Sequence, residues 1–275
     1  MGIILAILLF SAIIIIHELG HFLLAKANGI RVDEFSLGLG PTLFGKQFGE
    51  TKFSVKLLPF GGACMMGEDD VEDISEGSFN SKSVWARMSV IVAGPLFNLI
   101  LAWILCMIMI AWVGYRTPVV GGVMDGYSAQ EQGLSEGDVI TKIGGRSVHI
   151  WNDISLYNLT HSEEKEVEIT YKRDGKTHTA VLEPRQKEGD TAPLLGVTGG
   201  KMERPGFFGT LKYGAYTVKY WIDYTVDSLR MLVTGRVGMK DLSGPVGIVS
   251  AVDGVYQEAA PAGLSVIILN LMNIG

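Results

Sequence analysis

Two long apolar runs dominate the pattern of hydrophobic and polar positions along the chain. The first extends from Ile3 to Ala25, and the second extends from Met88 to Val113 without a charged residue. About 20 apolar residues suffice for a helix to cross the hydrocarbon core of a membrane. The pattern therefore predicts two transmembrane helices. The first run lacks the basic start and the small-residue cleavage site of a signal peptide, so we expect it to be retained.

The second run contains Gly94, Pro95 and Asn98. The glycine and the proline favour a kink in the helix, and a polar amide at membrane depth should face protein rather than lipid. A bend of purely structural origin is the alternative to a functional role for this segment.

Basic residues are concentrated between the two apolar runs. By the positive-inside rule, this stretch lies in the cytoplasm and the residues after Arg116 begin outside it. Within the stretch, the turn signal Gly49-Glu50 and the alternating apolar residues after it predict a β-hairpin over about 42–62. Two roles are open for this hairpin: it offers an edge strand to an extended substrate, or it only packs against its neighbours.

The pattern changes to short alternating strands separated by glycine turns over 117–200, which predicts a small soluble α+β domain. Aromatic and charged residues are interleaved between Phe207 and Val233, which is typical of an amphipathic helix at the membrane surface. We expect this helix and a loop to occupy 201–261. The apolar run over 262–275 is too short to span a bilayer, so we expect a third span that is truncated.

The expected fold class is therefore an α-helical multi-pass membrane protein with a membrane-associated β-hairpin and an inserted α+β domain. Apolar residues make up 48% of the 275 residues, and the formal net charge is -6. An acidic chain without a basic patch argues against a nucleic-acid partner. The two cysteines, Cys64 and Cys106, fit neither a disulfide framework nor a zinc site, so we expect buried thiols.

Candidate chemistry lies in the first run, in the pattern His17-Glu18-Leu19-Gly20-His21. In a helix, positions i and i+4 share a face, so both imidazoles can bind one metal ion with Glu18 beside it. A Zn²⁺ ion would offset the cost of placing these groups in lipid, supply an electrophile and acidify its bound water, leaving Glu18 as general base. The alternative is a chance motif on a buried helix, with the histidines bonded to carbonyl oxygens and Glu18 paired to a lysine.

Four motifs, in this order, resemble those of the site-2 proteases, in particular the bacterial regulator of sigma-E protease group. They are His17 to His21, Phe60-Gly61-Gly62, Ala93-Gly94-Pro95 with Asn98, and Leu242-Ser243-Gly244-Pro245-Val246-Gly247. The resemblance covers essentially the whole chain. It implies an intramembrane zinc endopeptidase that cleaves transmembrane segments, for example of an anti-sigma factor or a signal-peptide remnant. It assigns zinc to His17 and His21, catalysis to Glu18, and substrate contacts to Phe60, Gly61, Gly62 and Asn98.

The soluble domain resembles a PDZ domain, because the segment from Gly133 to Ile140 and the following Ile143-Gly144-Gly145 match that family's strand-turn signature. The resemblance implies a peptide-carboxylate loop with Gly121 and Gly122, whose free backbone amides would receive a peptide C-terminus. Binding of a chain end and screening of substrates by size are both open.

In the site-2 proteases, an aspartate of a later span supplies the third zinc ligand, within a segment of the form N-x-x-P-x-P-x-L-D-G. This sequence has Asn270 and Asn273 but ends at Gly275. We therefore expect a fragment that lacks the third ligand and binds zinc weakly. Asp223 and Asp227 are not expected to replace it, because their aromatic and charged neighbours indicate a solvated helix face.

Two other functions are open besides the protease. A non-catalytic membrane-anchored protein would use the PDZ-like domain to capture peptide ends, and a transporter would use the ionisable groups of the first run as a relay. Repeated hydrophobic halves, which many transporters have, are not visible in the sequence. We expect a protein of the bacterial plasma membrane whose partners are transmembrane substrates and the lipid bilayer, with the metal site near the cytoplasmic side.

Overall fold

The computed structural model describes residues 2–67, 74–161, 163–187, 193–238 and 244–259. Two compact units are distinguished, a first unit of residues 1–105 and 243–275 and a second unit of residues 106–242. The first unit contains the HExxH motif, and the second contains the expected soluble domain.

The two apolar runs form the helices α1 (Gly2–Ala27) and α2 (Val84–Trp112). Both have the length and the apolar composition of membrane spans. α2 remains helical through Pro95, although proline lacks the N–H that would bond to the preceding turn. The expected spans over about 3–25 and 88–113 therefore coincide with helices that extend a few residues further.

The hairpin consists of β1 (Glu34–Phe48) and β2 (Thr51–Met65), joined at Gly49, and is longer than the expected 42–62. Both strands bend, so that the start of β1 pairs with β2 twice, once with residues 52–55 and once with residues 62–65. Gly38 and Gly61 adopt positive φ angles of 85° and 90° at the bends, where the sequence suggested strand ends. The segment 62–65 therefore lies at one edge of the curled sheet.

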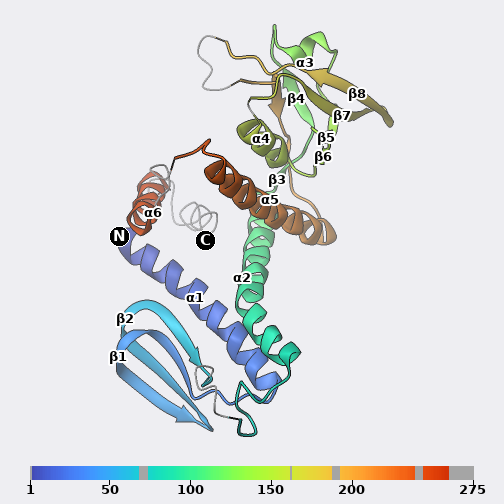
Figure 1. Ribbon diagram of the computed structural model, residues 1–275. Coiled ribbons are helices and arrows are strands. Elements are labelled where there is room, and N and C mark those ends of the chain that lie inside the picture. The colour runs from blue at the N-terminus through green and yellow to red at the C-terminus, as the bar shows by residue number, and fades with distance from the viewer. Residues whose placement is uncertain (1, 68–73, 162, 188–192, 239–243, 260–275) are drawn as a thin grey trace. The chain divides into compact units, whose positions relative to one another are not determined.

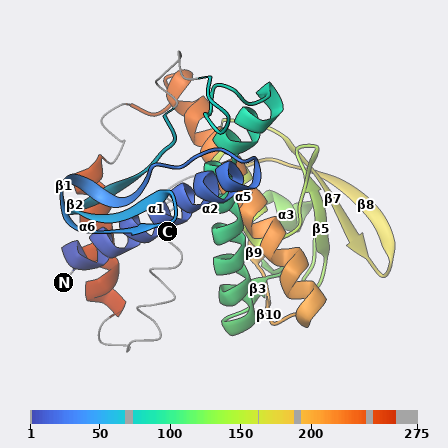
Figure 2. The same ribbon diagram turned by 90° about the horizontal axis from the view of Figure 1, so that it is seen from below.

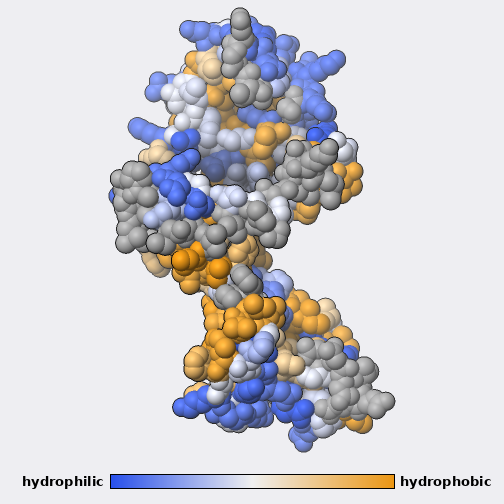
Figure 3. Space-filling model, turned by 90° about the vertical axis from the view of Figure 1, so that its left-hand side faces the viewer, coloured by the Kyte–Doolittle hydropathy of each residue, from blue (hydrophilic) through white to orange (hydrophobic). Residues whose placement is uncertain are grey.

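The hairpin lies beside α1 in both ribbon views (Figure 1 and Figure 2). A small core of buried apolar residues joins α1, the hairpin and α2, and it includes Ala25, Val32, Cys64 and Val90. Many other large apolar side chains of these elements are exposed, for example Phe44, Leu57 and Ile91. Figure 3 shows this kind of surface as broad orange areas. Exposure of apolar surface on this scale is typical of contact with lipid or with another protein.

A helix, α6 (Pro245–Ala259), occupies part of the region that we expected to be a loop up to residue 261. Proline is favoured in the first turn of a helix, so the Gly244-Pro245 sequence marks a helix start rather than a continuing loop. Val252 of α6 is buried against Ala6 of α1. The apolar run over 262–275, including Asn270 and Asn273, lies outside the described residues.

The second unit contains the predicted α+β domain. Its four-stranded sheet has the order β6-β5-β7-β8, and β4 and β9 form a separate antiparallel pair, as do β3 and β10. The strands are β3 (Tyr115–Arg116), β4 (Val120–Val123), β5 (Val139–Ile143), β6 (Arg146–Ser147), β7 (Val167–Arg173), β8 (Lys176–Leu182), β9 (Val197–Gly199) and β10 (Met202–Glu203). The helices α3 (Ser128–Glu131) and α4 (Trp151–Thr160) complete the domain, around a core that includes Ile140, Ile154 and Ile169.

The long helix α5 (Phe207–Val233) covers the residues for which an amphipathic helix was expected. It packs against α4, and Tyr216 stacks on His149 with a centroid distance of 3.8 Å. Tyr213 stacks on Tyr115 at the same distance, in a cluster that also contains Ile110 near the end of α2. α5 is therefore fixed to the residues that follow the second apolar helix.

Candidate metal centre

The two histidines of the motif point at each other from successive turns of α1. Their Nε2 atoms are 3.2 Å apart, and their rings meet edge to face with a centroid distance of 4.8 Å. Two ligand atoms at 2.0–2.1 Å from one tetrahedral zinc ion lie about 3.3 Å apart. The pair therefore has the spacing that a shared metal ion requires.

α2 supplies the neighbours of both rings on the opposite side. His21 Nδ1 lies 2.7 Å from the carbonyl oxygen of Val90, and His17 Nδ1 lies 3.3 Å from Nδ2 of Asn98. A carbonyl oxygen can only accept, so His21 carries its proton on Nδ1 and has a free electron pair on Nε2. The tautomer suited to metal binding is thus fixed for His21.

Gly94 of α2 faces the point at which the two Nε2 atoms converge. A Cβ atom built on Gly94 would lie 2.4 Å from Nε2 of His21 and 2.7 Å from Nε2 of His17. A Zn–N bond is shorter, at about 2.0–2.1 Å, but the missing side chain leaves the space in front of both ligand atoms open on the side of residue 94. The residues present fit a zinc ion in this respect.

The side chain of Glu18 extends from α1 to the edge segment of β2, at Gly62. A Cβ atom on Gly62 would be 3.0 Å from Cγ of Glu18, 3.1 Å from Ile14 and 3.1 Å from the backbone oxygen of Ser36. The backbone of the Phe60-Gly61-Gly62 motif therefore passes directly beside the predicted general base. The side chain of Phe60 lies outside the described residues, so the substrate contacts of this motif remain a prediction.

A third protein ligand is not present at the two histidines within the described residues, which contain no group of three or more His, Cys, Asp or Glu side chains suited to a metal ion. Asp223 is exposed beside Lys219, as expected. The expectation of a solvated face is wrong for Asp227, which is only 6% exposed. Its carboxylate accepts two hydrogen bonds from Arg146 at 2.5 and 3.1 Å, and this contact lowers the pKa of Asp227.

The backbone around Gly121 and Gly122 is less free than the sequence suggested. β4 pairs with β9 through Gly122 and Thr198, and the Val120 N–H donates to the oxygen of Asp138. The amides of this strand are thus partly engaged within the domain, and a peptide contact at Gly121 and Gly122 remains a prediction.

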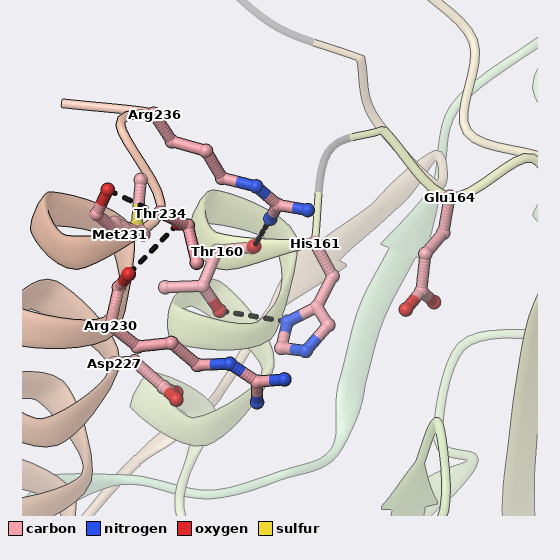
Figure 4. Close-up of a pocket in the computed structure, with 8 residues that line it drawn as sticks. All are labelled: Thr160, His161, Glu164, Asp227, Arg230, Met231, Thr234 and Arg236. Atoms are coloured by element: carbon pink, nitrogen blue, oxygen red, sulfur yellow. Dashed lines mark hydrogen bonds between the residues drawn. The ribbon is translucent and has the colours of Figure 1, made fainter.

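A cavity of about 250 Å³ in the second unit lies apart from all predicted site residues. Figure 4 shows the lining of this cavity. Arg230 of α5 and Arg236, which follows the end of α5, lie on one side, and His161, which follows α4, lies on the other. Arg236 donates to the oxygen of Thr160, so part of its charge is used to hold α4 and α5 together. Sequence spacing gave no signal for this cavity, because its lining residues are about 70 positions apart.

Comparison with known proteins decides the family, because residues 5–274 match peptidase family M50. The chain belongs to this family of site-2 proteases. It is accordingly a zinc metalloprotease and a membrane protein.

Relatives within this family are similar over most of their length. A protein of Clostridium acetobutylicum, named as a candidate zinc metalloprotease, is 38% identical over 95% of this chain and 76% of its own length. The regulator of sigma-W protease RasP of Bacillus subtilis is 29% identical over 98% of this chain and 85% of its own length. Among solved structures, the PDZ domain of an SdrC-like protein from Listeria monocytogenes is 28% identical, with a TM-score of 0.26, and covers 31% of this chain and 88% of that chain.

Proposed function

We propose that this M50 peptidase cleaves transmembrane segments of membrane proteins inside the bilayer, as a step of regulated intramembrane proteolysis. The observation that carries the proposal is the convergence of two Nε2 atoms on Gly94, with Glu18 beside them, between two helices of membrane-span length. Water alone is a poor nucleophile for a peptide bond, and these groups are of the kind that activate it.

Each described residue of the site has a defined task in this reaction. His17 and His21 would hold a zinc ion, which would act as a Lewis acid toward the scissile carbonyl group. Glu18 takes the proton of the attacking water and delivers it to the nitrogen of the leaving amine. The Val90 carbonyl oxygen holds His21 in the orientation that presents Nε2.

The edge segment of β2 is suited to hold the substrate. A transmembrane helix must unwind before its scissile carbonyl group can reach a metal ion, and an unwound segment needs partners for its backbone. Residues 62–65 pair with β1 on one side, and Gly62 lies against Glu18. We infer that an extended substrate pairs with this segment on the side away from β1, next to the general base.

The likeness to RasP supports a signalling substrate, such as an anti-sigma factor, and a signal-peptide remnant is the second substrate class that we propose. The excess of basic residues between α1 and α2 supports a cytoplasmic position for the hairpin and an extracytoplasmic position for the PDZ-like domain. The exposed apolar residues of α5, including Phe208, Ile222 and Val226, support its contact with the lipid surface.

The decisive experiment compares Glu18→Gln with the unsubstituted chain in detergent or in vesicles, on a reporter that carries one transmembrane segment. We expect cleavage to fall by about 10²- to 10⁴-fold while bound zinc, measured by metal analysis, is retained. Glu50→Gln is the matched control, because Glu50 is an exposed residue of the hairpin turn that pairs with Lys26. Unchanged cleavage by the Glu18→Gln variant would refute the protease mechanism, whereas a PDZ-based binding protein would retain its peptide affinity in both variants.

A further inference from the structure

The two imidazoles of the metal centre differ in the partner of their Nδ1 atom. His21 Nδ1 faces a backbone carbonyl oxygen, whereas His17 Nδ1 faces the side-chain amide of Asn98. A carbonyl oxygen accepts only, but an amide side chain can present either a donor or an acceptor, depending on its rotation. The position of the proton on His17 is therefore decided by Asn98.

The amide orientation described above leaves one polar atom unsatisfied. Its nitrogen Nδ2 donates to His17 Nδ1, and its oxygen Oδ1 is buried without a hydrogen-bond partner among the described residues. With this orientation the proton of His17 is on Nε2, where it points to Nε2 of His21 at 3.2 Å. In this tautomer His17 has no electron pair available for a metal ion on Nε2.

Rotation of the amide group by 180° gives His17 the tautomer that suits metal binding, and it places Nδ2 instead of Oδ1 at the buried position that has no partner among the described residues. It brings Oδ1 to His17 Nδ1, where it accepts the Nδ1–H hydrogen bond, and it leaves the electron pairs of both Nε2 atoms facing the space at Gly94. Amide oxygen and nitrogen are nearly isosteric, so the rotation requires no rearrangement of α1 or α2.

We propose that Asn98 is a positioning residue that prepares His17 for metal binding, by accepting the His17 Nδ1–H hydrogen bond through Oδ1. This inference rests on the proposed zinc site and assigns Asn98 a role different from the substrate contact that the sequence suggested. Partners of this kind fix the tautomer and the ring orientation of a metal-binding histidine, and their loss typically weakens metal binding 10- to 100-fold.

Two substitutions with opposite expectations test the proposal. Asn98→Leu has a similar shape but no acceptor, and Asn98→Asp offers only acceptors. The probe is Co²⁺, titrated into the metal-stripped full chain in detergent and followed by its visible absorption, with Zn²⁺ competition to give affinities. We expect Asn98→Leu to bind both ions about 10- to 100-fold more weakly, and Asn98→Asp to bind them at least as tightly as the unsubstituted chain.

Asn28→Leu is the matched control. Asn28 donates to the oxygen of Leu24 and to Oγ of Ser89, so it joins the same two helices without touching an imidazole. We expect its metal affinity to be unchanged, which separates loss of a helix contact from loss of the His17 partner. Equal metal affinity of Asn98→Leu and the unsubstituted chain would overturn the proposal, and so would an equal loss in the Leu and Asp variants.

The proposed function and the role of Asn98 fail in distinguishable ways. If the unsubstituted chain binds neither Co²⁺ nor Zn²⁺ at the histidines, the metal centre itself is refuted. If the unsubstituted chain binds metal and loses cleavage on Glu18→Gln, but Asn98→Leu binds metal normally, only the role of Asn98 is refuted.

Discussion

Two sets of acidic side chains, one from each unit, differ in whether the protein pairs them with a cation. In the second unit, Asp138 and Asp227 are 1% and 6% exposed, and each accepts two hydrogen bonds from an arginine. In the first unit, Glu18 forms no salt bridge to any described residue, and the two histidines next to it turn their Nε2 atoms toward each other.

This difference separates charges that hold the fold from charges that serve chemistry. A buried carboxylate that only stabilises a domain needs its full set of partners, because an unpaired charge is costly to desolvate. Groups that leave part of their binding capacity free keep it for something that the chain does not supply. Three substitutions test this contrast.

The largest effect is expected for Gly94→Ala. The new methyl group would occupy the space in front of both Nε2 atoms, at 2.4 and 2.7 Å, so we expect metal binding and cleavage to be abolished together. Metal analysis of the purified variant and the reporter assay measure this. Gly254→Ala is the control, since a Cβ atom at this helical glycine meets nothing within 4 Å. Normal zinc content in Gly94→Ala would contradict the assigned position of the metal ion.

A smaller effect is expected when a structural pair is broken in the second unit. Arg146→Met leaves the Asp227 carboxylate buried without its partner, which lowers the free energy of unfolding. Arg146 is 41% exposed, so water reaches the pair and we expect a loss of about 1–3 kcal/mol rather than the full cost of a buried charge. Urea unfolding of the full chain, followed by tryptophan fluorescence, measures it.

Asp223→Asn controls this experiment. Its partner Lys219 is one turn away on the exposed face of α5, and such pairs contribute at most about 0.5 kcal/mol. Equal losses of stability in Arg146→Met and Asp223→Asn would mean that burial of Asp227 has no energetic consequence.

The smallest effect concerns pH. The hydrogen bond from Arg146 holds the pKa of Asp227 below its ordinary value of 3.8. The unfolded chain therefore takes up this proton first as the pH falls, so the stabilisation is complete above about pH 5 and is lost as the pH falls through 3.8 toward the lowered pKa. We expect the stability difference between the unsubstituted chain and Asp227→Asn to be constant from pH 7 to 5 and to shrink below pH 4. A difference that grows on acidification would contradict the assigned sign.

The sequence was informative wherever a single local pattern determines the structure. The uncharged runs predicted α1 and α2, the Gly49-Glu50 turn predicted the hairpin, and the spacing of His17 and His21 predicted two imidazoles on one face. Each of these signals is complete within one element, because helix periodicity, turn geometry and apolar length are local properties.

What the sequence missed depends on residues far apart along the chain. The pair of Arg146 and Asp227 spans 81 positions, and no local pattern distinguishes Asp227 from the exposed Asp223. The sequence underestimated the lengths of β1 and β2. Glycines usually indicate strand ends in a sequence, but in this sheet they form bends within the strands. The contact of Asn98 with His17 and the place of Gly94 likewise follow only from how α1 and α2 meet.

These helices approach closely at Gly20, where a Cβ atom would lie 2.5 Å from the oxygen of Ala93. The main chains of the two helices lie next to each other there, with the ring of Phe97 beside them. Any slide or roll of one helix on the other would pull Val90 away from His21 and Asn98 away from His17 in the same motion. The contact between the two main chains and the orientation of both imidazoles are therefore preserved or lost together.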